Sequence, residues 1–378
     1  MKITIPNNIL SVLNTLKDSG FEAYLVGGCV RDMLLGIIPL DYDITTSATP
    51  EQIKLCFERT IDTGIKHGTV TVIIKKEPIE VTTFRTEGQY FDNRHPETVE
   101  FVTDLKEDLS RRDFTVNALA YNETVGLVDL FGGVNDLENR ILKAVGDPEK
   151  RFKEDALRIL RLFRFASQLN FEIEENTFKA ALKLQKGLQN ISRERIFTEL
   201  QKTVNGKNPK ALLPLIASGG LRFLGVKKSP EFYTKTRNPD LRLFAFLSGT
   251  DDPIAALREL KASKRQIDFA EKMLKLLRLK PQTKEDIKKA LFLTDEYAVS
   301  SYLEYTDNGK GLLSEITENG EPYLLSHLAV TGEDLADLGF RGREIGSQLE
   351  ILRQTVIKDP TKNKKEILLS LTKQGSAS

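Results

Sequence analysis

The pattern of apolar residues changes near residue 145, and this change constrains the fold more than any other feature of the sequence. Before it, β-branched runs at 68–75 and 79–84 alternate with short helical patterns, and glycines such as Gly27-Gly28 separate them. After it, apolar residues recur at helical spacing and the β-branched runs disappear. The sequence therefore predicts an α+β part over residues 1–145 and an all-α part over residues 146–378.

Local signals predict individual elements within both parts. Helices are expected over 6–17 and 30–35 and from Pro50, where Thr49 is a typical N-cap, and strands over 22–26 and 42–45. The two β-branched runs are expected to pair as a hairpin separated by Lys76-Glu77-Pro78. One continuous helix is expected over 151–168. Further helices are expected over 196–204, 253–260, 269–277 and 345–356.

Composition excludes several classes of protein. The 378 residues leave room for two or three domains of about 100–200 residues each. Cys29 and Cys56 form no C-x-x-C pair, and no two of the three histidines are close in sequence, which argues against a structural zinc site and His-rich metal hydrolases. No apolar run reaches about 18 residues, and the first residues lack a signal-peptide core. We therefore expect a cytoplasmic protein without a membrane partner.

The net charge of +1 conceals a split along the chain. Residues 1–150 contain 16 Lys and Arg against 24 Asp and Glu, a net charge of −8, and the remainder contains 39 against 30, a net charge of +9. An acidic first part suits divalent cations, and a basic second part suits a polyanion such as nucleic acid. A solvated Lys/Glu surface explains the counts equally simply.

The first chemical lead is the pair Asp41 and Asp43. Residues i and i+2 of a strand face the same side, so their carboxylates repel unless a cation lies between them. Gly28 and Arg31 lie a short distance upstream, where glycine lets the backbone approach phosphates and arginine adds a charge-assisted contact. The alternatives are a solvated strand end and an ion pair of Arg31 with a neighbouring aspartate. Glu80 offers a third carboxylate, aimed either at solvent or at the same metal.

Two clusters of arginine supply further leads. Arg111-Arg112 precedes a run that reads as buried, and it could clamp phosphates or RNA, or be a surface pair with Asp113 as a helix cap. In the helix expected over 151–168, Asp155, Arg158, Arg161 and Arg164 lie three residues apart, outside the apolar stripe. An Asp155/Arg158 pair is either a solvated ion pair or a reader of base edges, because carboxylate and guanidinium match the donors and acceptors of C and A.

These motifs together closely resemble a known family, the class II (bacterial-type) tRNA nucleotidyltransferases, which are CCA-adding enzymes of the polymerase-beta-like superfamily. The resemblance rests on motifs in this order: Gly27-Gly28-Cys29-Val30-Arg31-Asp32, Asp41-Tyr42-Asp43, Arg111-Arg112-Asp113-Phe114-Thr115-Val116-Asn117-Ala118 and Glu154-Asp155-Ala156-Leu157-Arg158. Further matches are Arg94-His95-Pro96 with Val99-Glu100-Phe101 in a flexible loop region, Ser192-x-Glu194-Arg195-Ile196, and the tail stretch Thr331-Gly332-Glu333-Asp334-Leu335. No motif is recognised over about 210–320.

The resemblance implies roles for single residues and ranges. Asp41 and Asp43 would bind Mg²⁺, and Glu80 matches the third carboxylate position only loosely. The nucleotide would be bound by Gly28, Arg31, Arg112, Asp155, Arg158, Arg161 and Arg164, with Asp155 and Arg158 as the protein template. The implied architecture is a nucleotidyltransferase head over 1–145, followed by an all-α neck over 146–207, body over 208–295 and tRNA-binding tail over 296–378.

The implied activity is template-independent addition of C, C and A to the tRNA 3′ end from CTP and ATP by two-metal nucleotidyl transfer. An enzyme that adds only the final A, or a poly(A) polymerase, remains an alternative, as does a non-catalytic RNA-binding relative. The CC-adding kind lacks the flexible loop, for which residues 88–102 are a candidate. A dinucleotide-binding protein is disfavoured because Gly27-Gly28 lacks the G-x-G-x-x-G spacing. Whether the protein is a monomer or a homodimer is open.

Overall fold

The computed structural model describes residues 4–87, 99–228 and 231–374. The predicted flexible loop stretch Arg94-His95-Pro96 lies outside the described residues. The chain divides into two compact units, one of Met1–Ser229 with Gly249–Asp251 and one of Pro230–Ser248 with Asp252–Ser378. All the sequence motifs that predict chemistry fall in the first unit.

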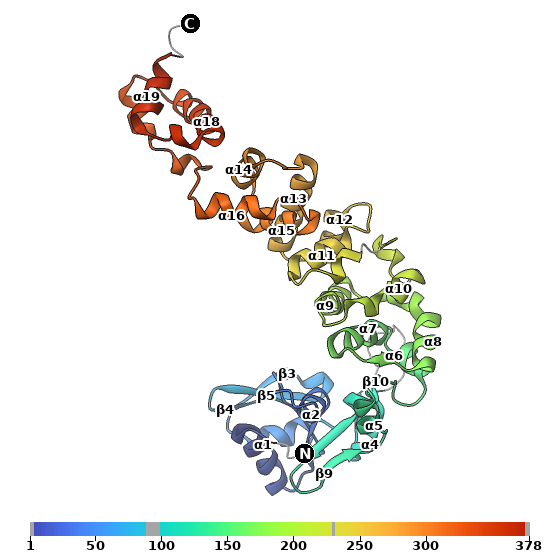
Figure 1. The fold of residues 1–378 in the computed structure, drawn as a ribbon. Coiled ribbons are helices and arrows are strands. Elements are labelled where there is room, and N and C mark those ends of the chain that lie inside the picture. Colours follow the sequence, from blue (N-terminus) through green and yellow to red (C-terminus); the bar gives the residue numbers. More distant parts are fainter. Residues whose placement is uncertain (1–3, 88–98, 229–230, 375–378) are drawn as a thin grey trace. The chain divides into compact units, whose positions relative to one another are not determined.

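The first unit contains a seven-stranded mixed sheet (Figure 1). Only β2 and β5 run parallel, and every other neighbouring pair in this sheet is antiparallel. In spatial order the strands are β3 (Thr60–Gly64), β4 (Thr69–Ile74), β5 (Glu77–Thr83), β2 (Asp43–Thr46), β1 (Ala23–Val26), β8 (Leu119–Asn122) and β9 (Gly126–Asp129). The short strands β6 (Arg85–Glu87) and β7 (Val99–Phe101) pair separately.

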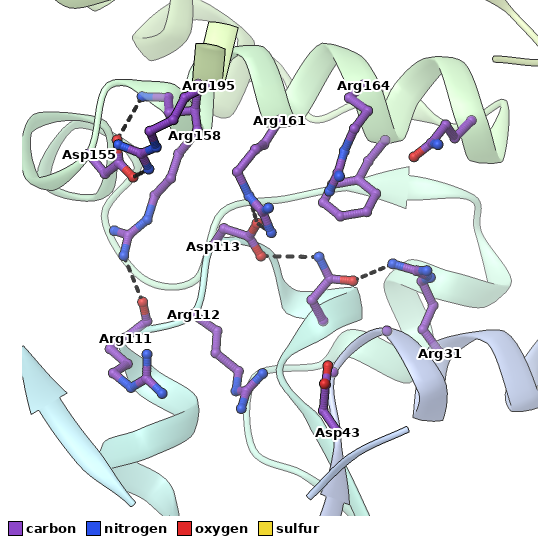
Figure 2. Close-up of a pocket in the computed structure, with 16 residues that line it drawn as sticks. Arg31, Asp43, Arg111, Arg112, Asp113, Asp155, Arg158, Arg161, Arg164 and Arg195 are labelled. Carbon is purple, nitrogen blue, oxygen red and sulfur yellow. Dashed lines mark hydrogen bonds and ion pairs between the residues drawn. The ribbon is translucent and has the colours of Figure 1, made fainter. Parts of the chain in front are cut away.

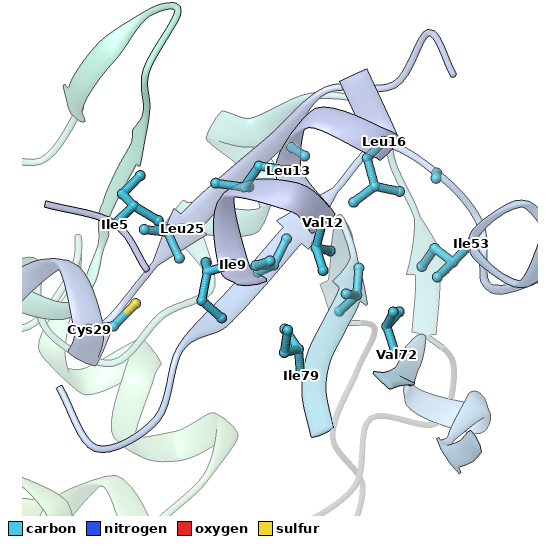
Figure 3. Close-up of a cluster of buried hydrophobic side chains, with 14 of the residues drawn as sticks. Ile5, Ile9, Val12, Leu13, Leu16, Leu25, Cys29, Ile53, Val72 and Ile79 are labelled. Atoms are coloured by element: carbon cyan, nitrogen blue, oxygen red, sulfur yellow. The ribbon is translucent and has the colours of Figure 1, made fainter. Parts of the chain in front are cut away.

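Helices pack an apolar core on one face of this sheet. Helix α1 (Asn7–Asp18) places Ile9, Val12, Leu13 and Leu16 on one buried stripe, as its helical spacing predicts. Figure 3 shows this stripe above alternate residues of the sheet. Helix α3 (Pro50–Cys56) contributes to the same core and begins with a Thr49 capping box, which confirms the predicted start.

The opposite face of the sheet is apolar at one end and polar at the other. Helix α4 (Leu105–Ser110) covers β1 and β8 through a small cluster that includes Tyr24 and Phe84. On the neighbouring strands the same face carries polar side chains, because Asp43 is the register partner of Glu80 and side chains alternate along each strand. This polar half of the face is where the predicted carboxylates gather.

The hairpin of β4 and β5 forms as predicted, but its turn is one residue earlier. Lys75 and Lys76 occupy the two turn positions, both with positive φ (51° and 73°), and Glu77 already pairs with Ile74. Two consecutive left-handed residues are the geometry of the tight turn that matches the twist of the strands. Pro78 therefore lies within β5, at the end of the strand beyond its pairing with β2.

The rest of the first unit is helical, with one exception. Strand β11 (Glu172–Ile173) pairs with β10 (Ile141–Leu142), so the prediction of an all-α part after residue 145 misses one short strand. The helices of this unit beyond α1, α3 and α4 are α2 (Gly28–Leu34), α5 (Gly133–Glu138), α6 (Pro148–Glu154), α7 (Leu157–Leu169), α8 (Glu175–Leu184), α9 (Arg193–Val204) and α10 (Leu213–Ala217).

In the second unit, all the regular structure described is helical, as predicted. Its helices are α11 (Pro239–Leu247), α12 (Pro253–Glu259), α13 (Lys264–Leu279), α14 (Lys284–Leu293), α15 (Glu296–Thr306), α16 (Lys310–Glu318), α17 (Gly332–Asp337), α18 (Arg343–Lys358) and α19 (Lys365–Gln374). Helices α17 to α19 share a small core of their own around Leu335, Leu352 and Leu368. Within the described ranges, no helix has both the length and the apolar character needed to cross a bilayer.

Candidate active site

A basic pocket of about 520 Å³ opens beside the end of the sheet (Figure 2). Seven arginines and three aspartates contribute to its wall, and they come from the sheet, from α2, from the segment after α4 and from α7 and α9. The lining residues are Gly27, Gly28, Arg31, Asp43, Arg111, Arg112, Asp113, Asn117, Asp155, Leu157, Arg158, Arg161, Arg164, Phe165, Gln168 and Arg195. Such an excess of guanidinium groups fits a ligand with several negative charges.

Glycine brings the backbone close to Arg112 at one end of the pocket. Gly27 has a φ of +77°, and a Cβ atom there would lie 3.0 Å from Nη1 of Arg112. Helix α2 begins at Gly28 and carries Arg31, whose Nη1 donates to Oδ1 of Asn117 at 2.6 Å. Arg31 also pairs with Asp32 at 2.7 Å, so it both lines the pocket and makes one of the ion pairs predicted as its alternative.

The aspartate pair is present, but only one member lies on a strand. Strand β2 begins at Asp43, and Asp41 lies in the bend before it, so the prediction that both lie on a strand is wrong. Burial raises the pKa of Asp43, Arg112 lowers it and Asp41 raises it, with a net upward direction. The two carboxylates therefore interact unfavourably, as expected for an acidic pair without a cation between them.

A second cavity, of about 870 Å³, adjoins the carboxylates. Asp41, Asp43 and Glu80 all line it, and Asp43 lines the basic pocket as well. Within the described residues, no three His, Cys, Asp or Glu side chains are grouped so that they alone could hold a metal ion. Mg²⁺ is usually held by one or two carboxylates together with substrate phosphates, so a pair of aspartates beside an arginine-lined pocket fits this ion.

The helix predicted over 151–168 is broken at Asp155, so this prediction is wrong. Asp155 ends α6 with φ −140° and ψ 106°, and α7 begins two residues later. Its Oδ1 accepts from the backbone N of Leu157 at 2.9 Å, as an N-cap does, and its Oδ2 accepts from Arg195 at 2.7 Å. Arg158 contacts Glu154 at 2.5 Å and the carbonyl of Arg111 at 3.0 Å. Asp155 and Arg158 still line the same pocket.

Asp113, for which the sequence offered a helix cap as one alternative, is buried and organises the pocket centre. Oδ2 of Asp113 pairs with Arg161 at 2.6 Å, and its Oδ1 accepts from Asn117 at 3.1 Å. Because Asn117 also accepts from Arg31, one chain of hydrogen bonds joins the two walls (Figure 2). Burial alone would raise the pKa of Asp113, but the Arg161 guanidinium and these hydrogen bonds lower it to about 2.

Three guanidinium groups surround the ring of Phe165. Arg31, Arg161 and Arg164 lie 5.2, 5.4 and 4.0 Å from its centroid. Arg164 also pairs with Glu199 of α9 at 3.0 Å, and burial and the neighbouring Arg161 lower its pKa to about 10. Each of these three arginines has a carboxylate partner, Arg31 in Asp32, Arg161 in Asp113 and Arg164 in Glu199, so the positive charges are gathered at one wall by buried or half-buried ion pairs.

Of the predicted site residues, eight line the basic pocket and two line only the second cavity. The eight are Gly28, Arg31, Asp43, Arg112, Asp155, Arg158, Arg161 and Arg164. Asp41 and Glu80 line the second cavity. The sequence assigned no site role to Asn117, Phe165 or Arg195, although Asn117 and Arg195 both belong to the quoted motifs. The role of Asn117 depends on a contact with a residue 86 positions away, which no local pattern reveals.

Comparison with known proteins first defines a class. Residues 23–143 match the family model described as "Poly A polymerase head domain", and residues 170–223 match "Probable RNA and SrmB- binding site of polymerase A". Together with the paired aspartates beside an arginine-lined pocket, this match identifies a nucleotidyltransferase of the polymerase-beta-like superfamily.

Full-length relatives then define the family. The chain is 40% identical to the CCA-adding enzyme of Lactobacillus helveticus, covering 94% of this chain and 93% of that protein. It is 38% identical to the CCA-adding enzyme of Enterococcus faecalis, covering 99% and 98%. The crystal structure of the Bacillus stearothermophilus CCA-adding enzyme in complex with CTP has a TM-score of 0.81 at 32% identity, covering 99% and 98%. The chain belongs to the CCA-adding enzymes.

Proposed function

We propose that this protein adds C, C and A to the 3′ end of tRNA from CTP and ATP, and that the residues of the basic pocket select the nucleotide. The observation that carries the assignment is the position of Asp43, which lines both the arginine-rich pocket and the cavity with Asp41 and Glu80. A triphosphate in the pocket and a tRNA 3′-hydroxyl entering from the second cavity would meet at this carboxylate.

Asp41 and Asp43 are the residues we assign to Mg²⁺, and Glu80 on the neighbouring strand is the candidate third ligand. The raised pKa of Asp43 and its repulsion by Asp41 suit a site that a cation stabilises. Bound Mg²⁺ would lower the pKa of the attacking hydroxyl and stabilise charge on the leaving oxygen. The need for a divalent metal is general in this family, and the identity of the ion is part of the proposal.

We assign triphosphate binding to the arginines beside Gly27 and Gly28. Arg112 lies against Gly27, and Arg31 is held by Asn117 on the opposite side. Fixed guanidinium groups stabilise the negative charge that develops on the leaving pyrophosphate, and Gly28 leaves room for the phosphates beside the backbone. These groups accelerate transfer by position and charge, because they need no reorganisation during the reaction.

Asp155 and Arg158 are the residues we assign to the base edge. The bond from Arg195 holds the carboxylate of Asp155, and Glu154 and the Arg111 carbonyl hold Arg158. Arg161 and Arg164 complete the wall. The wrong base would leave polar groups of the pocket unpaired. Such a pocket favours the correct nucleotide over the wrong one by about 10⁴-fold or more. Such a pocket selects a nucleotide without a nucleic-acid template.

The remaining assignments concern the parts of the chain. Residues 1–145 are the catalytic head, 146–207 the neck with the nucleotide-reading helix, 208–295 the body and 296–378 the tail. The net charge of +9 after residue 150 supports binding of the tRNA backbone by these helical parts. A cytoplasmic location stays a prediction from the sequence, and the free thiols of Cys29 and Cys56 agree with the reducing compartment it assumes.

The experiment that tests this function uses tRNA transcripts that end at the discriminator base, at C or at CC. Each is incubated with the protein, Mg²⁺ and CTP, ATP or both, and products are resolved at single-nucleotide length. Full CCA addition predicts three added residues on the shortest tRNA, a requirement for both nucleotides, and then a stop. Extension of only the CC-ending tRNA by one A would establish the A-adding alternative, and a long ATP-dependent ladder a poly(A) polymerase. No extension would refute the catalytic assignment.

A further inference from the structure

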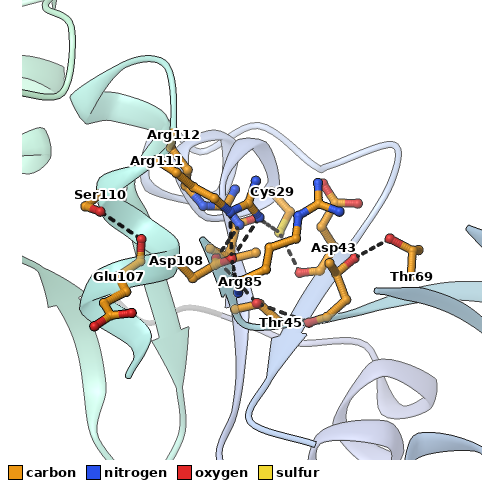
Figure 4. Close-up of polar contacts among 12 residues, drawn as sticks. Cys29, Asp43, Thr45, Thr69, Arg85, Glu107, Asp108, Ser110, Arg111 and Arg112 are labelled. Atoms are coloured by element: carbon orange, nitrogen blue, oxygen red, sulfur yellow. Dashed lines mark hydrogen bonds and ion pairs between the residues drawn. The ribbon is translucent and has the colours of Figure 1, made fainter. Parts of the chain in front are cut away.

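A buried carboxylate outside the basic pocket connects β2, the strand that carries Asp43, to two arginines that line the pocket. The side chain of Asp108, on α4, is 0% exposed (Figure 4). Its Oδ1 accepts from Arg111 at 2.7 Å, and its Oδ2 accepts from Arg112 at 3.1 Å. Asp108 does not line either cavity described above, so it acts on the site only through the residues it holds.

The same carboxylate also contacts the sheet. The hydroxyl of Thr45 lies 3.4 Å from Oδ2 of Asp108 and 3.2 Å from the carbonyl of Thr82, so its single proton can serve either acceptor, and the backbone N of Arg85 donates to Oδ1 of Asp108 at 3.4 Å. Thr45 lies two residues after Asp43 on β2, so the two side chains share one face of the sheet. Asp108 therefore links the strand that carries Asp43, the first residue of β6 and both adjacent arginines.

Arg112 depends on this link for its orientation. Its Nη2 is bonded to Asp108, while its Nη1 lies close to Gly27 and its charge influences Asp43. The buried Nε of Arg112 has no hydrogen-bond partner in the parts of the chain that the structure describes. Burial alone would raise the pKa of Asp108, but Arg112 and Arg111 lower it, so the carboxylate is ionised at neutral pH.

We propose that Asp108 is a positioning residue that fixes the direction of Arg112, and with it Arg111, relative to Asp43. The proposal rests on the nucleotidyl transfer proposed above and adds a residue to its machinery. In Asp108→Asn the arginines keep their charges, because a guanidinium stays protonated at any pH used for the assay. The asparagine amide, however, has only one acceptor oxygen. Its NH₂ group therefore faces either Arg111 or Arg112, which are themselves donors. The guanidinium of Arg112 still attracts a triphosphate, but its direction is no longer fixed.

The loss of orientation is expected to lower turnover and to leave nucleotide affinity nearly unchanged. With ATP and a CC-ending tRNA, Asp108→Asn is expected to lower kcat by about 100-fold, the usual consequence of displacing a positioning group by about 1 Å. The KM for ATP is expected to change by less than about threefold, which is the pattern of an interaction realised in the transition state. A purely structural role would lower kcat in proportion to the folded fraction and leave the kinetics of the remaining enzyme unchanged.

The matched control is Asp104→Asn. Asp104 caps the same helix through the backbone N of Lys106 at 2.8 Å and is exposed. Asparagine caps a helix about as well as aspartate, so this replacement removes one negative charge from α4 without touching either arginine, and kcat should remain within about twofold of wild type. If Asp104→Asn reproduces the loss seen in Asp108→Asn, the effect comes from any lost charge on this helix and the proposal is overturned.

A double-mutant cycle tests whether Asp108 acts through Arg112. Asp108→Asn should lower kcat far less in an Arg112→Ala background than in the wild type, because the group it orients is already gone. Equal losses in both backgrounds would overturn the proposal, and so would an unchanged kcat in the single variant. Should Asp108→Asn fail to fold, Thr45→Val removes the link to β2 without leaving a buried charge, and it must lower kcat at constant KM. A wild-type protein that adds no nucleotide would refute the proposed function itself.

Discussion

Asp113→Asn is the substitution whose effect can be worked out most fully from the structure. The wild-type carboxylate pairs with Arg161 at 2.6 Å and has its pKa lowered from 3.8 to about 2. This lowering of the pKa corresponds to roughly 2 kcal/mol of stability at pH 7. The asparagine removes this contribution and turns an amide N–H toward the buried guanidinium. We expect the melting temperature of the first unit to fall by about 5–10 °C.

The contribution of Asp113 to stability should depend on pH in a defined direction. Because the folded-state pKa is depressed, the contribution is complete above the unfolded pKa of about 4 and is lost as the pH falls from about 4 to 2. The difference between wild type and variant, measured by urea unfolding, should therefore be constant from pH 7 to 5 and shrink below pH 4. The control is Asp32→Asn, which removes a partly exposed pair with Arg31 and should cost less than about 1 kcal/mol. A difference below about 0.5 kcal/mol at pH 7 would refute the reasoning.

Three further predictions follow from the site and the charge distribution. Asp43→Asn should lower nucleotide incorporation by at least about 10³-fold while leaving the melting temperature unchanged or slightly raised, because the raised pKa means that the fold disfavours the ionised form. Glu199→Gln should destabilise the first unit by about 3 kcal/mol in urea unfolding, because it leaves the buried Arg164 without its carboxylate, and a loss under about 1 kcal/mol would contradict this. Affinity for tRNA, measured by filter binding, should fall by at least about 100-fold between 50 and 200 mM salt, and a flat response would exclude a phosphate-binding body.

Several elements of the head were predicted correctly because the signals for them lie within short stretches of sequence. The α1 stripe, the Thr49 cap and the paired β-branched runs each depend on residues within one element. The turn at Lys75-Lys76 was misplaced by one residue, since Pro78 suggested a later end to the turn region than the backbone adopts. Strand β11 has only two residues, too few for an alternating pattern to show.

The break at Asp155 illustrates what periodicity cannot detect. Phe152, Ala156, Ile159 and Phe163 keep helical spacing across the break, so the apolar stripe continues although the helix does not. An aspartate is a common N-cap and could have suggested a new helix start. The partner that holds it, Arg195, lies 40 residues away, and Arg161 lies 48 residues from Asp113. Contacts of this range determine the geometry of the pocket and appear in no single motif.

The most direct test of the central claim measures which nucleotides the protein itself selects. kcat/KM is determined for CTP, UTP, ATP and GTP on a tRNA that lacks CCA and on one that ends in CC, for wild type and for Arg158→Ala, with melting curves to show that the variant is folded. If Arg158 reads the base edge, the wild type prefers CTP over UTP on the first tRNA and ATP over GTP on the second, and Arg158→Ala loses most of both preferences. Unchanged preferences in a folded Arg158→Ala would contradict selection by this pocket.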